Sequence, residues 1–157
     1  MKPSVYLETT IPSYLTAWRS PELVMAANQE TTRSWWDTAR PKFEIFISVL
    51  VFDEASSGDP EAVKRRLAII NDIPALDISE QAEELAARLL AAAALPAKAK
   101  ADALHIAIAT VHGMDYMLTW NCKHIANAAM RLKIESICKS SGYEPPIICT
   151  PLELMED

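Results

Sequence analysis

Three acidic residues and one amide stand at the ends of segments that have the composition of strands or helices. Glu8 ends an apolar segment near the N-terminus, and Glu54 lies just after a second one. Asp102 begins an Ala- and Ile-rich segment, and Asn121 directly follows another apolar run. Carboxylates gathered in a partly buried cleft repel one another unless a cation lies between them. Hard oxygen ligands suit Mg²⁺ or Mn²⁺, which take further ligands from phosphate, so the set predicts metal-assisted cleavage of phosphodiester bonds.

Each carboxylate also has a purely structural explanation. Asp102 would be favoured by the dipole of the helix that it begins. Asp53 and Asp59 flank Glu54, and only one of these acids need face a site. Glu8 is harder to explain in this way, because a charge that directly ends a buried strand is costly unless it faces an open cleft. Glu8 is therefore the residue on which the metal hypothesis rests.

The histidines nearest to these residues are His105, three positions after Asp102, and His124, three positions after Asn121. The first spacing puts His105 and Asp102 on one helix face, so either histidine could border the cleft. A lone histidine on an Ala/Ile face is more often a packing residue with satisfied hydrogen bonds. We therefore leave both histidines out of the predicted catalytic set.

Cysteine usage points to a reducing compartment. Cys122, Cys138 and Cys149 are odd in number and lack C-x-x-C spacing, and no apolar signal segment follows Met1. Their spacing does not fit a tight zinc site. We expect a cytoplasmic protein with free thiols.

Composition limits the class of protein. The chain has 157 residues, of which 50% are hydrophobic and 23% charged, which is typical of a soluble globular protein and not of a membrane-spanning one. We expect a single domain over residues 1–157. The three glycines, Gly58, Gly113 and Gly142, are far apart, which excludes both a P-loop and a G-x-G-x-x-G turn.

The charge balance is acidic, with 15 Lys and Arg against 21 Asp and Glu and a formal net charge of −6. A nucleic-acid substrate would therefore need a bound metal or a local basic rim, for which Lys64–Arg66, Lys98 and Lys100 are candidates. Most such runs are only solvated helix faces. The overall balance favours partners with a basic segment.

Strand-like and helix-like segments alternate along the chain, which predicts an α/β fold with a mainly parallel sheet. In such sheets ligands bind outside the carboxyl ends of the strands, where the four candidate residues would meet. The predicted strands are 4–7, 43–48, 73–78, 116–120 and 147–149, and the predicted helices are 21–39, 49–55, 61–71, 79–94, 98–112 and 126–139, with another beginning near Pro12.

Four segments resemble those of a known family. Val5–Leu15, Ser48–Glu54, Ala101–Ala109 and Leu118–Asn121 are similar, in order and separation, to the motifs of PIN-domain ribonucleases, and within them to VapC-type toxins of toxin–antitoxin pairs. The resemblance spans nearly the whole chain. It implies a three-layer α/β/α PIN-like fold with a central, mainly parallel sheet.

The resemblance also implies a function and a site. The expected protein is a Mg²⁺- or Mn²⁺-dependent endoribonuclease that acts on an RNA substrate, forms a homodimer and is neutralised by a protein antitoxin with a basic segment. By position, Glu8, Glu54 and Asp102 match the metal-binding acids of the family, and Asn121 matches a fourth catalytic position.

Two departures from the family pattern bear on activity. The first acid and the fourth position are usually both Asp, whereas this chain has Glu8 and Asn121. The neutral amide leaves three formal negative charges, so a second cation should bind weakly if at all. An alternative interpretation is a PIN-like module without turnover that binds a protein or RNA, and Asn121 is the residue that favours it.

Overall fold

Within residues 1–155, the part of the chain that the computed structural model describes, five short strands form one sheet in the order β3-β2-β1-β4-β5. Every neighbouring pair is parallel, as the alternating pattern predicted. The strands are β1 (Ser4–Leu7), β2 (Glu44–Ser48), β3 (Ala75–Leu76), β4 (Tyr116–Leu118) and β5 (Ile147–Cys149).

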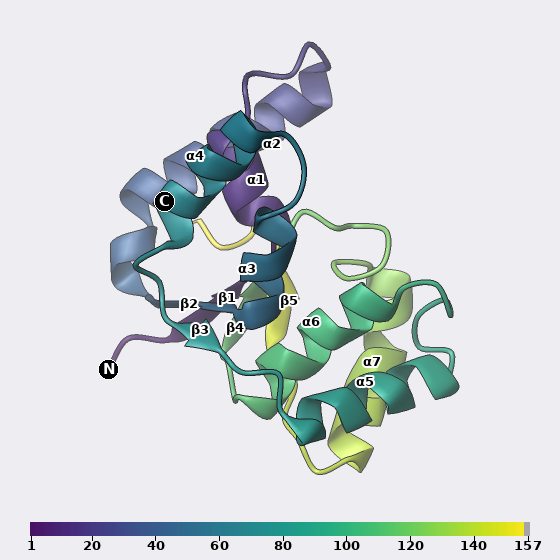
Figure 1. The fold of residues 1–157 in the computed structure, drawn as a ribbon. Coiled ribbons are helices and arrows are strands. Elements are labelled where there is room, and N and C mark those ends of the chain that lie inside the picture. Colours follow the sequence, from purple (N-terminus) through teal and green to yellow (C-terminus); the bar gives the residue numbers. More distant parts are fainter. Residues whose placement is uncertain (156–157) are drawn as a thin grey trace.

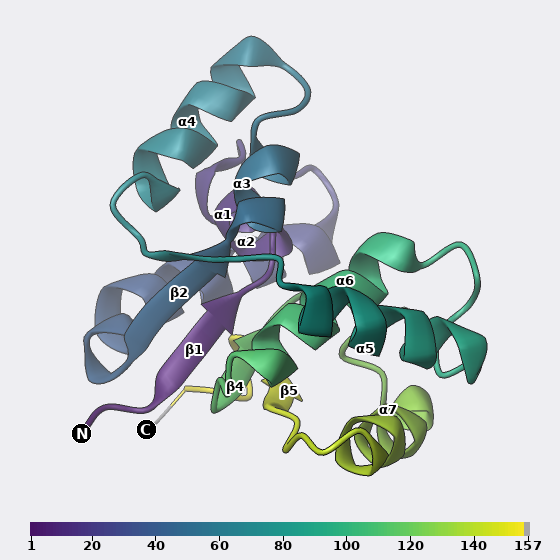
Figure 2. The ribbon, with the colours of Figure 1, turned by 60° about the horizontal axis from the view of Figure 1, so that its bottom comes forward.

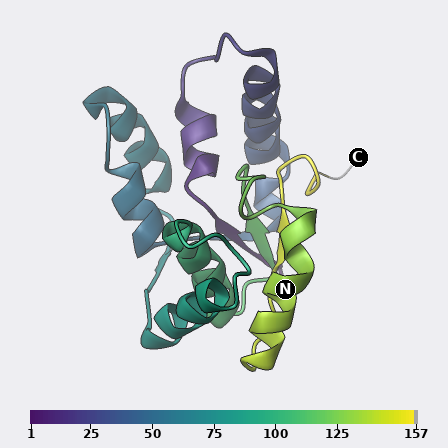
Figure 3. The same ribbon diagram turned by 90° about the vertical axis from the view of Figure 1, so that its right-hand side faces the viewer.

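Helices cover both sides of this sheet (Figures 1 and 3). The helices α1 to α4 lie on one side and α5 to α7 on the other, which gives the three layers that we expected. Their bounds are α1 (Thr10–Thr16), α2 (Leu23–Thr38), α3 (Val49–Ala55), α4 (Pro60–Ile70), α5 (Glu80–Ala91), α6 (Lys100–Val111) and α7 (Ala128–Ser140), with a 3₁₀ turn η1 at Arg40–Lys42.

Strand β1 occupies the centre of the sheet, between β2 and β4 (Figure 2). Both of its faces are covered by helices, so its side chains form a continuous apolar run and do not alternate. Val5 and Tyr6 are 0% exposed and Leu7 is 1% exposed. Glu8 thus follows the most deeply buried strand of the molecule.

Side-chain caps fix where the helices α3, α4, α5 and α7 begin. The hydroxyl of Ser48 accepts a hydrogen bond from the Val51 amide at 3.2 Å and starts α3 directly after β2. Asp59 caps α4 and Ser79 caps α5 in the same manner. Such caps satisfy amides that the first helical turn leaves without a partner. Ser48 therefore fixes the position of the whole helix that carries Glu54.

Strand β4 is shorter than its sequence suggested. We predicted a strand to Trp120, but β4 ends at Leu118. The amide of Trp120 donates to the hydroxyl of Thr10 at 2.9 Å and takes no part in the sheet ladder. This contact turns the chain after β4 toward the start of α1, next to Glu8.

The strand order also fixes where a ligand site can form. The chain builds β1, β2 and β3 toward one edge and then crosses back to place β4 and β5 on the other side of β1. The connections after β1 and β4 therefore diverge, which opens a crevice at the carboxyl ends of these two strands.

Among residues 1–155, no helix combines the length and apolar character needed to cross a membrane.

Candidate metal centre

Glu8 and Glu54 meet at this crevice, together with His105. One ligand atom from each of the three residues lies within 4.8 Å of the others. Glu8 follows β1, Glu54 is in α3 and His105 is in α6, so the group joins the sheet to helices from both of its sides. Figure 1 shows α3 and α6 approaching each other beside β1. The structure thus brings together two of the three predicted metal ligands.

The carboxylate of Glu8 is buried and held by two hydroxyl groups. Its Oε1 accepts hydrogen bonds from Thr10 and, at 2.6 Å, from Thr119, and the residue is only 5% exposed. Within residues 1–155, its other oxygen, Oε2, accepts no hydrogen bond. Oε2 is not one of the polar atoms of residues 1–155 that are both fully buried and without a partner. Because it has no hydrogen-bond partner, it must be accessible to solvent. One oxygen of Glu8 is fixed and the other faces the crevice.

Glu54 is held in the same way. Its Oε1 accepts hydrogen bonds from Thr9 Oγ1 and from His105 Nε2, the latter at 2.6 Å. Burial by itself raises the pKa of Glu54. The hydrogen bond from His105, the charge that His105 carries when protonated and the bond from Thr9 outweigh this, so the pKa of Glu54 lies below its ordinary value of 4.5. Glu54 is therefore an ionised acceptor at neutral pH.

The lowered pKa predicts how stability depends on pH. Because the folded-state pKa is below the unfolded value of 4.5, ionised Glu54 stabilises the fold above pH 4.5, and this contribution is lost as pH falls through the folded-state pKa. In Glu54→Gln the amide oxygen can accept the same hydrogen bonds without the charge. Urea unfolding should therefore show the wild type more stable than the variant at neutral pH.

The same comparison at about pH 3 should give a smaller difference between the two proteins. The Glu54 side chain is 33% exposed, so solvent screening keeps the difference modest even at neutral pH. A difference that stays constant from neutral to acid pH would show that the charge of Glu54 adds nothing to stability.

His105 belongs to this site, although sequence reasoning left it out. It is 1% exposed, and Nδ1 lies 2.7 Å from the hydroxyl of Tyr6 while Nε2 contacts Glu54. The Tyr6 hydroxyl lies 2.7 Å from Ser48 Oγ. The available signal was the three-residue spacing from Asp102, which shows a shared helix face but not what that face contacts.

Asp102 and Asn121 form a second, adjoining group. Asn121 Nδ2 donates to Asp102 Oδ1 at 3.0 Å, and Asp102 Oδ2 lies 2.9 Å from His124 Nδ1. Asn121 Oδ1 accepts from the His124 amide at 3.0 Å. Asp102 is not among the groups that lie within 4.8 Å of one another, so the three carboxylates that we expected to converge are placed in two adjoining groups. Its carboxylate is partnered by an amide and an imidazole.

Thr119 connects the two groups. Its hydroxyl donates to Glu8 Oε1 at 2.6 Å and accepts from the Asn121 amide at 2.9 Å. Thr119, directly after β4, thus forms a hydrogen bond with a residue of each group. The two groups form one continuous polar network, in which Asn121 is linked to Glu8 through a single side chain.

An aromatic pair stands next to this network. The rings of Tyr14 and Trp120 are stacked with their centroids 6.0 Å apart and an interplanar angle of 11°. The indole Nε1 of Trp120 donates to Thr32 at 2.7 Å, which fixes this ring against α2. Burial, with smaller effects from Cys122, Glu8 and Glu22, raises the pKa of Tyr14, so its hydroxyl stays protonated.

The oxygen donors at this site fit a hard divalent cation. Within residues 1–155, the carboxylates of Glu8 and Glu54 each have one oxygen without a hydrogen bond, and hydroxyl groups and His105 hold the other oxygens in place. Oxygen ligands of this kind suit Mg²⁺ and Mn²⁺. Glu8, Glu54 and His105 thus form a group that could hold a metal ion.

The candidate basic residues have different surroundings. Arg65 donates to the Thr16 carbonyl at 3.1 Å and Arg66 to the Ala55 carbonyl at 3.1 Å, so both are occupied in joining helices. Lys98 and Lys100 are exposed and immediately precede Asp102. They are the better candidates for a rim that contacts phosphate.

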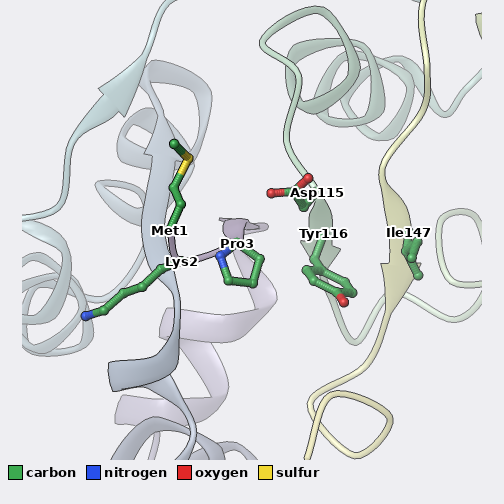
Figure 4. A pocket seen from close by; sticks show the side chains of 6 residues that line it. All are labelled: Met1, Lys2, Pro3, Asp115, Tyr116 and Ile147. Carbon is green, nitrogen blue, oxygen red and sulfur yellow. The ribbon is translucent and has the colours of Figure 1, made fainter.

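A separate hollow of about 400 Å³ lies at the opposite edge of the sheet, where the strands begin (Figure 4). Asp115 is its acidic residue, and this carboxylate is occupied by the amide and hydroxyl of Ser4, at 2.9 and 3.1 Å. The hollow contains none of the residues of the candidate metal centre. It is lined by Met1, Lys2, Pro3, Asp115, Tyr116 and Ile147.

Comparisons with known proteins support the fold. No family model and no curated protein sequence matches the chain. Among solved structures, the chain is similar to a chain in the crystal structure of VapBC2 from Rickettsia felis bound to a DNA fragment from their promoter. The match has a TM-score of 0.56 at 15% identity and covers 93% of this chain and 97% of the other. The fold is therefore PIN-like, as the motif resemblance implied.

Proposed function

We propose that this chain is a metal-dependent endoribonuclease, a VapC-type toxin built as a single PIN-like domain over residues 1–157. The observation that carries the proposal is the pairing of Glu8 and Glu54 within 4.8 Å at the carboxyl edge of the sheet. Two carboxylates at this distance repel one another, and each has an oxygen available to a cation.

In the proposed site, Glu8, Glu54 and Asp102 hold Mg²⁺ or Mn²⁺, and Asn121 positions a water molecule or the substrate. A divalent cation bound there would polarise a phosphodiester and lower the pKa of its water. Mg²⁺ and Mn²⁺ keep several waters, so Asp102 can act through one of them although it lies outside the tight group. Lys98 and Lys100 would attract the phosphates of the RNA.

The likeness to VapBC2 also supports a protein partner. We propose that an antitoxin with a basic segment neutralises this protein in the cytoplasm, and that the toxin forms a homodimer. The net charge of −6 favours binding of such a segment. Complex formation should therefore weaken at high salt.

Cleavage of mixed RNA by the purified protein tests the proposal. We expect fragments with Mn²⁺ and none with EDTA, and a loss of at least about 100-fold in rate for Glu54→Gln, as for removal of one essential charge-stabilising group. Asp53→Asn is the matched control, because Asp53 is the neighbouring acid but is exposed. It should cleave at the wild-type rate.

Two results would contradict the proposal. If the wild type binds RNA without cutting it in any divalent cation, the chain is the inactive binding module that Asn121 favours. Cleavage that is equal in the wild type and Glu54→Gln would indicate a contaminating nuclease.

A further inference from the structure

His105 lies among the candidate ligands, and its role there can be decided from its hydrogen bonds. It could bind a cation through Nε2, or its Nε2–H could donate a hydrogen bond to Glu54, but it cannot do both. Which nitrogen carries the proton depends on the bond that the other nitrogen makes. The partners of Nδ1 therefore decide the question.

The hydrogen-bond chain begins at Ser48. Ser48 Oγ accepts from the Val51 amide, and its own proton needs an acceptor because the residue is 0% exposed. Within residues 1–155, the one other partner of this hydroxyl is Tyr6, at 2.7 Å. Ser48 therefore donates to the oxygen of Tyr6.

The next step follows from Tyr6. Its hydroxyl keeps its proton, because burial raises the pKa of Tyr6 far above the ordinary value of 10.0, with a hydrogen bond from Ser48 as the main opposing effect. The oxygen already accepts from Ser48, so the Tyr6 proton points to its other neighbour, His105 Nδ1, at 2.7 Å. Nδ1 is then an acceptor and carries no proton, which places the proton of the imidazole on Nε2.

The reverse direction leaves a group unsatisfied. If Nδ1 donated to Tyr6 and Tyr6 donated to Ser48, the Ser48 proton would have no acceptor among the described residues. A buried donor without a partner is costly, so this direction is disfavoured. When each group donates to the next, from Ser48 through Tyr6 and His105 to Glu54, every donor in this series of hydrogen bonds has an acceptor.

We propose that His105 is a positioning residue and not a metal ligand: Ser48 and Tyr6 hold it as the neutral tautomer with the proton on Nε2, and this N–H fixes the carboxylate of Glu54. The Nε2–Oε1 contact is short, at 2.6 Å, which is consistent with a hydrogen bond to an ionised carboxylate. The cation of the proposed function is then bound through oxygen atoms alone. This part of the inference rests on the proposed function, whereas the tautomer does not.

Nitrogen-15 NMR of the metal-free wild type tests the tautomer directly. The Nε2 of His105 should have the shift of a protonated nitrogen and Nδ1 that of an unprotonated one. The chain has three histidines, so His112→Gln and His124→Gln assign the signals. In Tyr6→Phe the Nδ1 signal should shift, because its hydrogen bond is lost. A proton on Nδ1 in the wild type would overturn the inference, whether or not the protein cleaves RNA.

Mn²⁺ titration separates the two roles. Gln at position 105 keeps an N–H donor for Glu54 but offers no imidazole nitrogen, so His105→Gln should retain Mn²⁺ affinity within about threefold. His105→Ala removes the donor and should lose about 10–100-fold, as is usual for groups that orient a ligand. The ratio of Ni²⁺ to Mn²⁺ affinity should be equal in the wild type and His105→Gln, since a nitrogen ligand would favour Ni²⁺.

A large loss of Mn²⁺ affinity in His105→Gln, with a fall in the Ni²⁺ preference, would make His105 a ligand and overturn the inference. His112→Gln is the control, because within residues 1–155 His112 Nε2 hydrogen-bonds to the Asp77 carbonyl, at 2.9 Å, and to no residue of the site. Absence of Mn²⁺ binding by the wild type would contradict the proposed function, while the NMR result would still decide the tautomer.

Discussion

Replacing Glu8 by Gln is expected to weaken Mn²⁺ binding by at least about 100-fold, because altering a residue that merely orients a ligand already costs about 10–100-fold. The fold should be retained, since the amide oxygen can accept the same two hydrogen bonds from Thr10 and Thr119. Calorimetric titration measures the affinity. Glu44→Gln is the matched control, because it removes the same charge from an exposed position at the other edge of the sheet.

Asp102→Asn provides the contrast that distinguishes the two groups. Asp102 lies outside the tight group, so its charge should act at longer range or through a water molecule, and we expect a loss of about tenfold. If Asp102→Asn reduced affinity as much as Glu8→Gln, the cation would lie between the groups. Unchanged affinity in Glu8→Gln would remove the crevice as the metal site.

Asn121→Asp is expected to make thermal stability depend on divalent cations. The Asn121 amide donates to Asp102 Oδ1 at 3.0 Å, and a carboxylate in its place would put two negative groups in contact. Loss of this bond and the repulsion should cost about 1–3 kcal/mol. For a chain of this size that corresponds to a fall in Tm of about 5 °C in EDTA.

Saturating Mn²⁺ should remove most of this difference, because a cation between Asp102 and the new carboxylate offsets their repulsion. Asn127→Asp is the control: it also replaces a donating amide by a carboxylate, but the partners of Asn127 are the Lys123 carbonyl and the Ala129 amide and not another carboxylate, so its Tm should not depend on Mn²⁺. An equal fall in Tm with and without Mn²⁺ would show that no cation binds near Asn121. In RNA cleavage, Asn121→Asp should raise the rate at low Mg²⁺ and matter little at saturation.

The order of the strands and helices could be predicted from local patterns in the sequence. Apolar runs, the prolines at helix starts and the caps Asp59 and Ser79 mark elements within a few residues of their positions in the structure. A charge at the end of a buried strand was visible in the same way: Glu8 is 5% exposed and lies in the tight group of the candidate site. These features depend on a few neighbouring residues, which a single sequence displays.

The sequence did not determine which of the neighbouring acidic residues enters the candidate site. Asp53 and Glu54 are adjacent in α3, and only their rotation about the helix axis decides which one enters the site. Ser48 fixes this rotation through its bond to Val51, which leaves Asp53 exposed and turns Glu54 toward His105. A capping serine is visible in a sequence, but the direction that it gives to residue 54 is not.

The partners of His105 and Asp102 could not be predicted from the sequence. Both residues share a face of α6, yet His105 contacts Glu54 and Tyr6 while Asp102 contacts Asn121 and His124. These contacts join residues up to 99 positions apart. They depend on the rotation of α6 about its own axis where it packs against the sheet. Because the helix is rich in Ala and Ile, its sequence alone does not single out one rotation.

The central place of β1 has a consequence for synthesis on the ribosome. Its first neighbour, β2, is made soon afterwards, but its second neighbour begins at Tyr116, and Ser4 and Asp115 are 111 residues apart. At about 5–20 residues per second, the nascent chain takes roughly 6–22 s to supply that strand. Throughout this time at least one edge of β1 is open, the kind of surface on which chains aggregate. The speed of translation, and not only the stability of the finished fold, therefore sets how long the new chain needs protection.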